Sequence, residues 1–199
     1  MQAKLRTWIP TFAGMTNVCM TYETETKILD VDKKQIGQTL ASLGAKKILD
    51  TKFVVDWFWE PGTKEGEEPW FLRIRTDTEG NSEVTWKARS EKLGKSRTHK
   101  EINFKVGDAG AVGEFLKELK LENNAHQEKF RISWELKDWR FDLDEYPGMP
   151  AYLEIEGTSE EHIQEAIRIL GLKNHKTSNE GERILIQKEY GLDWYRMRF

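Results

Sequence analysis

Apolar and charged side chains alternate, residue by residue, in many short segments of this chain. In residues 70–76, for example, Leu72 and Ile74 alternate with Arg73 and Arg75. Successive residues of a β-strand point to opposite sides of the sheet, so such a segment has one apolar face and one charged face. On this pattern we predict strands over 21–31, 46–59, 70–76, 83–89, 98–106, 127–137, 138–145 and 151–157.

A few segments show a helical periodicity instead. We predict helices over 33–43, 108–120 and 159–170, and a less regular one over 180–191. Asp32 and Ser159 are suitable N-caps, and Gly44 and Gly171 are suitable residues for the ends of two helices. Strands outnumber helices and do not alternate with them, so the predicted fold class is α+β, with an antiparallel sheet or barrel flanked by helices.

The composition narrows the class of protein. Eight Trp residues and an aromatic content of 11% are not expected of a disordered chain. A net charge of −3 gives no reason to expect nucleic acid or an anionic membrane as partner, and no apolar run approaches the ~20 residues of a transmembrane helix. The single Cys19 cannot form an internal disulfide, as expected of a cytoplasmic protein. We expect residues 1–20 to be a disordered extension and residues 21–199 to form a single domain.

The charged faces of the predicted strands differ in sign. Basic pairs occur on three strands, as Arg73/Arg75, Lys87/Arg89 and Lys129/Arg131. Acidic pairs occur on the first strand and the last two, as Glu23/Glu25, Asp142/Asp144 and Glu154/Glu156. Any one of these pairs could equally belong to a strand whose polar face simply meets water. Like charges on neighbouring strands destabilise a sheet, however, so this segregation indicates a ligand that neutralises each group.

A polyphosphate bound together with a divalent metal ion would complement both the basic and the acidic pairs. Arginine binds phosphate oxygens in a bidentate manner, and lysine adds a point charge. Glu23 and Glu25 lie about 7 Å apart on one strand face, and carboxylates of this kind hold Mg²⁺ or Mn²⁺. The sequence contains no glycine-rich phosphate loop, so the ligand would be held by side chains on strands.

Taken in order, these segments resemble the CYTH superfamily, the triphosphate tunnel metalloenzymes. That superfamily includes class IV adenylyl cyclases, thiamine triphosphatases and inorganic triphosphatases. The matching segments are Glu23-x-Glu25-x-Lys27, Leu72 to Arg75, Thr85-Trp86-Lys87 with Arg89, Lys129-x-Arg131, Leu143-Asp144, and Glu154-Ile155-Glu156-Gly157. The resemblance implies an eight-stranded antiparallel β-barrel, or tunnel, whose charged faces point inward.

The resemblance also implies roles for individual residues. The metal ligands would be Glu23, Glu25, Glu101, Asp144, Glu154 and Glu156. The triphosphate would be bound by Arg73, Arg75, Lys87, Arg89, Lys129 and Arg131. The catalytic residues would be Lys27, Glu25 and Asp144, with Lys27 contacting a phosphate or orienting a water molecule.

Two segments depart from the family pattern. The strand that the family often shows as Arg-x-Glu-x-Glu aligns with His99, Glu101 and Asn103, which keeps only the middle acid. Asn103 provides an oxygen but no charge, which would weaken a second metal site. The family's C-terminal Ser-Tyr element is represented only by Thr177-Ser178-Asn179.

These observations predict a metal-dependent enzyme that processes a triphosphate, with Mg²⁺ or Mn²⁺ as cofactor. We favour a phosphohydrolase acting on ATP, thiamine triphosphate or tripolyphosphate, because a cyclase needs an additional adenine pocket. The alternatives are a class IV adenylyl cyclase and a non-catalytic module that binds polyphosphate or nucleotide. The protein would be a monomer or a homodimer, and most of its tryptophans would pack in the core.

Overall fold

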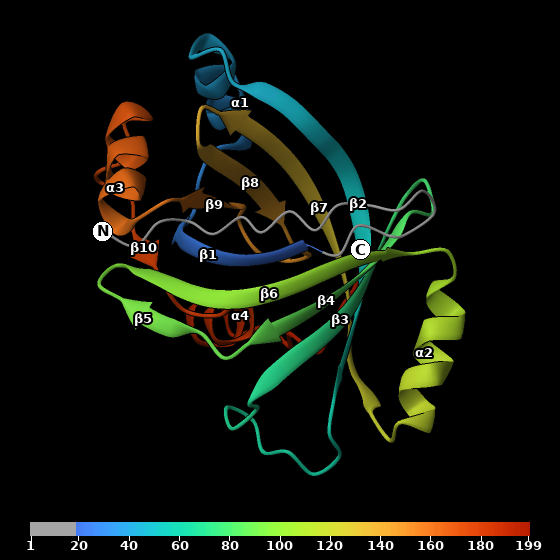
Figure 1. The fold of residues 1–199 in the computed structure, drawn as a ribbon. Helices are drawn as coiled ribbons and strands as arrows, with labels where there is room; N and C mark the ends of the chain where they lie inside the picture. Colours follow the sequence, from blue (N-terminus) through green and yellow to red (C-terminus); the bar gives the residue numbers. More distant parts are fainter. Residues whose placement is uncertain (1–18) are drawn as a thin grey trace.

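The computed structural model describes residues 19–199, and these form one sheet and four helices (Figure 1). The main strands are β1 (Cys19–Ile28), β2 (Lys46–Trp59), β3 (Trp70–Asp77), β4 (Ser82–Ala88), β6 (Ser96–Val106), β7 (Glu122–Leu136), β8 (Trp139–Glu145) and β9 (Tyr152–Gly157). The helices are α1 (Lys33–Ser42), α2 (Ala109–Glu118), α3 (Glu160–Ile169) and α4 (Glu182–Tyr190). Three short strands are added to these: β5 (Glu91–Leu93), β10 (Thr177–Ser178) and β11 (Arg196–Met197).

The main strands close into an antiparallel barrel, which confirms the predicted fold. Their order is β1-β9-β8-β7-β2-β3-β4-β6, and β6 pairs again with β1. Glu25 of β1 is aligned with Glu156 on one side and with Arg97 on the other. Because side chains alternate between the two surfaces of each strand, this register brings the charged faces of all these strands except β2 to the inside of the barrel.

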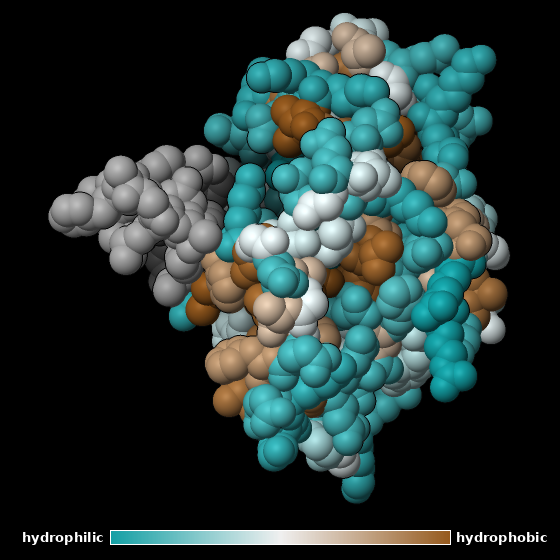
Figure 2. Space-filling model, turned by 90° about the vertical axis from the view of Figure 1, so that its right-hand side faces the viewer, coloured by the Kyte–Doolittle hydropathy of each residue, from teal (hydrophilic) through white to brown (hydrophobic). Residues whose placement is uncertain are grey.

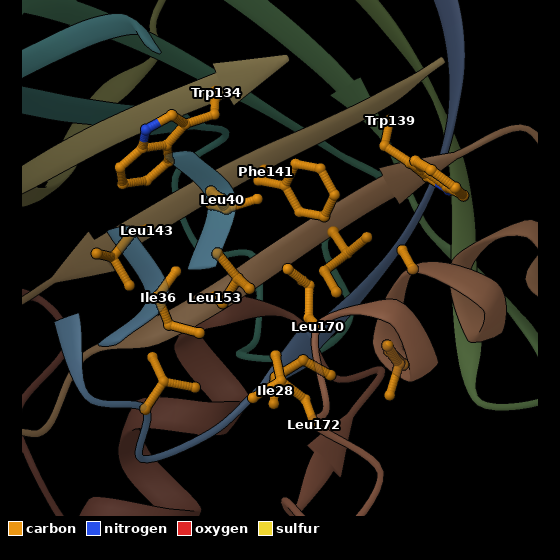
Figure 3. Packing of buried hydrophobic residues seen from close by; sticks show 14 of the residues in the cluster. Ile28, Ile36, Leu40, Trp134, Trp139, Phe141, Leu143, Leu153, Leu170 and Leu172 are labelled. Atoms are coloured by element: carbon orange, nitrogen blue, oxygen red, sulfur yellow. The ribbon is translucent and has the colours of Figure 1, made fainter. Parts of the chain in front are cut away.

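The largest apolar cluster covers the outside of β7, β8, β9 and β1 (Figure 3). Phe141, Leu143 and Leu153 extend from the strands toward α1, where Ile36 and Leu40 meet them. Helix α3 adds Ile163 and Ile167 to the same cluster. Its predicted N-cap is confirmed, because the Ser159 hydroxyl accepts a hydrogen bond of 3.2 Å from the His162 N–H.

Helix α2 covers the other outer wall of the barrel. Its Leu116 packs with Phe58, Ile74 and Val84, which come from β2, β3 and β4. The apolar residues of the alternating strands, on which the sequence prediction depended, therefore face outward into these two clusters. Figure 1 shows α1 and α3 on one side of the barrel and α2 on the other.

A third apolar cluster lies under α4 and fills one end of the barrel. It includes Val55 and Trp57 of β2, whose inner face is apolar, together with Leu185 and Ile186 of α4. Trp57 donates from its indole N–H to Gln127 Oε1 at 2.8 Å, and Gln127 in turn donates to the Trp194 carbonyl oxygen at 2.6 Å. The chain after α4 is therefore tied to the inside of the barrel.

Several details differ from the sequence prediction. β7 begins at Glu122 because its first residues pair with the last residues of β2, whereas we predicted residue 127. We predicted no strand between 90 and 97, but β5 forms over Glu91–Leu93 and pairs with the start of β6. β10 and β11 were not predicted, since two-residue strands carry no alternation pattern. The predicted extension over 1–20 lies outside the described residues, except that Cys19 and Met20 begin β1.

The surface is mixed in character. Figure 2 shows one face on which hydrophilic residues predominate and hydrophobic residues form separate small groups. Among residues 19–199, no helix combines the length and the hydropathy that a membrane span requires.

Candidate functional site

A cavity of about 410 Å³ lies inside the barrel, next to the first residues of α4. This volume falls within the range of about 300–1,000 Å³ that is usual for small-molecule sites. Most of the residues that the sequence singled out line it: Glu23, Arg73, Arg75, Lys87, Arg89, Glu101, Lys129, Arg131, Glu154 and Glu156. The other three, Glu25, Lys27 and Asp144, lie in the barrel wall but are not lining residues.

Glu25 and Lys27 are almost completely buried and bind each other. Lys27 Nζ lies 2.8 Å from Glu25 Oε1 and 2.7 Å from Glu154 Oε2. Arg97, from the adjacent β6, donates from Nε to Glu25 Oε1 at 2.7 Å. Burial alone would raise the pKa of Glu25, but Arg97 and Lys27 hold it well below its usual value. Glu25 is therefore an ionised carboxylate that already has two cationic partners.

Asp144 is fully buried and binds two of the predicted phosphate-binding residues. Arg131 contacts both of its oxygens, with Nε–Oδ1 at 2.6 Å and Nη2–Oδ2 at 2.5 Å. Lys129 Nζ and the Tyr152 hydroxyl reach Oδ2 at 2.9 Å and 3.1 Å. Against the effect of burial, Arg131 and Lys129 hold the pKa of Asp144 far below its usual value. Asp144 thus fixes the positions of the two bases.

Glu23, His99 and Glu101 form a compact group on β1 and β6, which we call the histidine cluster. One ligand atom from each lies within 4.8 Å of the others. His99 Nε2 is 2.8 Å from Glu101 Oε1 and 3.7 Å from Glu23 Oε2. The Lys87 ammonium group makes an ion pair with Glu101. Burial and the nearby Lys87 lower the pKa of His99.

Asp142, Glu154 and Glu156 form a second group on β8 and β9, which we call the carboxylate cluster. Their oxygens also lie within 4.8 Å of one another. Arg131 Nη1 lies 2.5 Å from Asp142 Oδ2, and Lys27 contacts Glu154. Burial, together with Glu23 and Asp142, raises the pKa of Glu156 well above its usual value.

The two clusters form one acidic wall of the cavity, and their negative charge is incompletely balanced. Burial and the Glu101 carboxylate raise the pKa of Glu23 to about 7. Carboxylates shift in this way when they face other carboxylates in a buried place, and a divalent cation relieves the repulsion. The donor set of carboxylate oxygens and one imidazole fits a divalent metal ion.

A second wall of the cavity is basic and belongs mainly to β3 and β4, beside β6. Arg73 is buried, its Nε has no hydrogen-bond partner among residues 19–199, and its guanidinium lies over the Trp57 ring at 5.6 Å. Arg75 lies over the Phe53 ring at 4.5 Å and binds Glu83 at 2.7 Å. Burial and the neighbouring Arg73 lower the pKa of Arg75 to about 10. This wall holds more positive charge than its own carboxylates neutralise, as a site for an anion would.

Sequence reasoning missed two kinds of residue. Arg97 belongs to the inner face of β6, and its signal was present: the alternation Arg97-x-His99-x-Glu101 begins one residue before the predicted strand. Read this way, β6 keeps the arginine and one glutamate of the family's Arg-x-Glu-x-Glu pattern. Glu182 of α4 gave no strand signal, yet it contacts Lys129 at 3.3 Å and accepts a hydrogen bond of 3.1 Å from the Trp194 indole.

A family model described as the CYTH domain matches residues 21–183. The chain belongs to the CYTH family. Members of this family are typically metal-dependent enzymes that process triphosphates, and the barrel with its inward charges is the fold expected of a CYTH protein. No curated protein matches this CYTH chain closely enough to count as a relative.

Solved structures show the same fold. The PH1012 protein of Pyrococcus horikoshii is 26% identical, with a TM-score of 0.65 over 77% of this chain and 94% of that chain. A putative adenylate cyclase of Vibrio parahaemolyticus is 10% identical, with a TM-score of 0.70 over 83% of this chain and 98% of that one. A putative adenylyl cyclase of Hippeastrum, described as having a dominant triphosphatase activity, is 14% identical, with a TM-score of 0.59 over 85% and 96% of the two chains.

Proposed function

We propose that this CYTH protein is a metal-dependent phosphohydrolase that acts on an organic or inorganic triphosphate. The observation that carries the proposal is that one cavity has both a basic wall, on β3 and β4, and an acidic wall, on β1, β6, β8 and β9. A triphosphate bound with a divalent cation has the complementary charges. ATP, thiamine triphosphate and tripolyphosphate all present this group.

The basic wall would bind the phosphates. Arg73 and Arg75 hold planar guanidinium groups against aromatic rings, which limits their motion. Apart from the Arg75 Nη2 group that binds Glu83, their N–H groups can donate to phosphate oxygens. Lys87 and Arg89 also line the cavity. Positive groups that are in place before the substrate arrives stabilise the charge that develops during phosphoryl transfer.

The metal ligands would be Glu23 and Glu101 of the histidine cluster and Glu154 and Glu156 of the carboxylate cluster, since all four line the cavity. A divalent ion bound there polarises phosphate oxygens and lowers the pKa of a coordinated water molecule. Asp142 belongs to the carboxylate cluster and also lines the cavity, so we add it to the candidate ligands.

We assign positioning roles to Glu25, Lys27 and Asp144, which the sequence suggested as catalytic residues. Lys27 binds Glu154 at 2.7 Å and would set the direction of that carboxylate. Glu25 holds Lys27 and Arg97 in place. Asp144 orients Lys129 and Arg131, which themselves line the cavity. These three residues support the site from behind its walls.

The second candidate reaction is cyclisation of ATP to cyclic AMP and pyrophosphate. It is kept because the relatives from Vibrio parahaemolyticus and Hippeastrum are described as putative adenylyl cyclases. The Hippeastrum protein is nevertheless described as having a dominant triphosphatase activity, so that description does not exclude hydrolysis. Hydrolysis needs only water as the acceptor, whereas cyclisation needs the ribose placed beside the α-phosphate.

One assay separates the candidates. The protein is incubated with tripolyphosphate, thiamine triphosphate or ATP in the presence of Mg²⁺ or Mn²⁺. Release of phosphate supports the phosphohydrolase, and formation of cyclic AMP with pyrophosphate supports the cyclase. Saturable binding without turnover, for every substrate and with either metal ion, supports a non-catalytic binding module. A Glu156→Gln variant that retains full metal-dependent turnover would remove the carboxylate cluster from the mechanism.

A further inference from the structure

We propose that the histidine cluster is a mixed imidazole–carboxylate metal site that prefers a divalent transition-metal ion, such as Mn²⁺ or Co²⁺, to Mg²⁺. The third ligand beside Glu23 and Glu101 is the Nε2 atom of His99. The inference rests on the proposed function, since it names the class of ion at the proposed site. It assigns to His99 a role that goes beyond the carboxylates considered so far.

The distances between the ligand atoms suit one small ion. His99 Nε2 lies 2.8 Å from Glu101 Oε1 and 3.7 Å from Glu23 Oε2. Two ligands at right angles around an ion, each about 2.1 Å from it, are about 3.0 Å apart, and wider angles give longer separations. The three atoms can therefore occupy neighbouring coordination positions after small side-chain adjustments.

The cluster is also in a suitable place. His99 and Glu101 are buried on adjacent inward positions of β6, and Glu23 is aligned with His99 across the β1–β6 pairing. Both glutamates line the cavity, so the remaining coordination positions of the ion would face the ligand space. A metal ion with open positions toward a cavity can take water or a phosphate oxygen.

The Lys87 ammonium group provides an independent indication that this place holds a cation. It is ion-paired with Glu101, and its Nζ lies 3.5 Å from His99 Nε2. Lys87 itself lines the cavity. A divalent ion that binds between Glu101 and His99 would displace the ammonium group toward the cavity, where phosphate oxygens can accept its hydrogen bonds. Metal and Lys87 should therefore compete for the cluster.

The donor chemistry determines the preference. Imidazole nitrogen binds first-row transition metals well, whereas Mg²⁺ takes oxygen ligands and keeps several of its water molecules. The carboxylate cluster on β8 and β9 offers oxygens alone, so it lacks this preference. Replacement of His99 by glutamine should weaken transition-metal binding more than Mg²⁺ binding.

Binding can be measured without any substrate. The full chain has four histidines, so the imidazole NMR signals are few. Titration with Co²⁺ should broaden or shift the His99 signal first, and Co²⁺ should also add a visible absorption band. We expect displacement of Co²⁺ to need at least about a tenfold excess of Mg²⁺, and H99Q to bind Co²⁺ at least about tenfold more weakly.

Two further variants sharpen the test. H126Q is the matched control, because His126 also contacts a carboxylate, Asp56 at 2.9 Å, but belongs to neither cluster. It should bind Co²⁺ as the wild type does. K87M removes the competing ammonium group and should bind Co²⁺ more tightly than the wild type.

The proposal is overturned if Co²⁺ leaves the His99 signal unchanged in the wild-type protein, a result that does not depend on the folding of any variant. It is also overturned if Mg²⁺ displaces Co²⁺ at equal concentration. If Co²⁺ binds through His99 but no triphosphate is turned over, the metal site stands and the phosphohydrolase proposal fails. If H99Q binds Co²⁺ as tightly as the wild type while triphosphate is still turned over, the phosphohydrolase stands and this site fails.

Discussion

Arg97 binds Glu25 across the pairing that closes the barrel, with 2.7 Å between Arg97 Nε and Glu25 Oε1. The two residues are aligned on β6 and β1, and Glu25 is buried. In an Arg97→Met variant, Glu25 would keep only Lys27, which it shares with Glu154. Loss of one partner of a buried ion pair costs about 3–5 kcal/mol. We expect the free energy of unfolding, measured in urea, to fall by about 3 kcal/mol.

The matched control for this variant is Lys47→Met. Lys47 also binds a carboxylate, that of Asp50 at 2.8 Å, but both side chains are more than half exposed. An exposed pair contributes little, so the change should stay below about 0.5 kcal/mol. If R97M and K47M unfold at the same urea concentration, Glu25 does not depend on Arg97.

The Arg73 side chain should contribute strongly to substrate binding and little to the stability of the fold. It is buried beside Arg75 and has no ion pair with a carboxylate among residues 19–199. We expect R73Q to raise the KM for the best triphosphate substrate at least about tenfold, because a charge-assisted contact to phosphate is lost. Its thermal unfolding midpoint should equal or exceed that of the wild type.

An Arg168→Gln variant controls for the loss of one positive charge, since Arg168 is exposed on α3 and does not line the cavity. Its KM should be unchanged. An unchanged KM in R73Q would contradict the assignment of the basic wall to phosphate binding.

Glu182 should make stability depend on pH in the acid range. Burial would raise its pKa, but Lys129 and a hydrogen bond from Trp194 lower it from 4.5 to about 2. A carboxyl group with a depressed pKa stabilises the folded protein above pH 4.5, and this stabilisation is lost as the pH falls toward 2. The difference corresponds to about 3 kcal/mol.

We therefore expect Glu182→Gln to be less stable than the wild type at pH 7, and the difference to shrink between pH 4.5 and pH 3. Urea unfolding at several pH values measures it. Glu118→Gln, on the exposed side of α2, should give a curve parallel to that of the wild type. A constant difference between E182Q and the wild type across this range would contradict the depressed pKa.

The apolar cluster between the barrel and helices α1 and α3 should contribute much of the stability of the fold. Phe141 is 1% exposed within the cluster beneath α1 and α3, whereas Phe115 on α2 is 60% exposed. Phe141→Ala should lower the free energy of unfolding by about 3–5 kcal/mol, since it leaves a cavity in the core. Phe115→Ala should change it by less than about 0.5 kcal/mol. Equal effects would show that this cluster is not the main outer core.

The strands were predictable because each one alternates. Leu72, Arg73, Ile74 and Arg75 have to face two different environments, and this pattern is local in the sequence. The closure of the barrel is not local. Nothing near Glu25 indicates that its neighbours will be Arg97 and Glu156, so the sequence alone left an open sheet and a closed barrel as alternatives. The family resemblance was needed to choose between them.

The ion-pair partners of the site residues could not be predicted from the sequence either. Glu25 and Asp144 carry the charges expected of metal ligands, but the structure surrounds them with Arg97, Lys27, Arg131 and Lys129. Whether a carboxylate meets a metal ion or an ammonium group depends on the three-dimensional register of several strands. Glu182 is a further case, because a helix that approaches the end of a barrel leaves no periodic signal of that approach.

The double pairing of β1 has a consequence for synthesis on the ribosome. The first strand of the barrel is made first, yet one of its neighbours is β9, which ends at Gly157. Until that residue has emerged, the growing chain is an open sheet whose two edges have unpaired backbone groups and whose charged inner face meets water. Barrel closure is therefore a late step in biogenesis. A nascent chain stalled before Gly157 would have neither the ligand cavity nor protection from strand-to-strand aggregation.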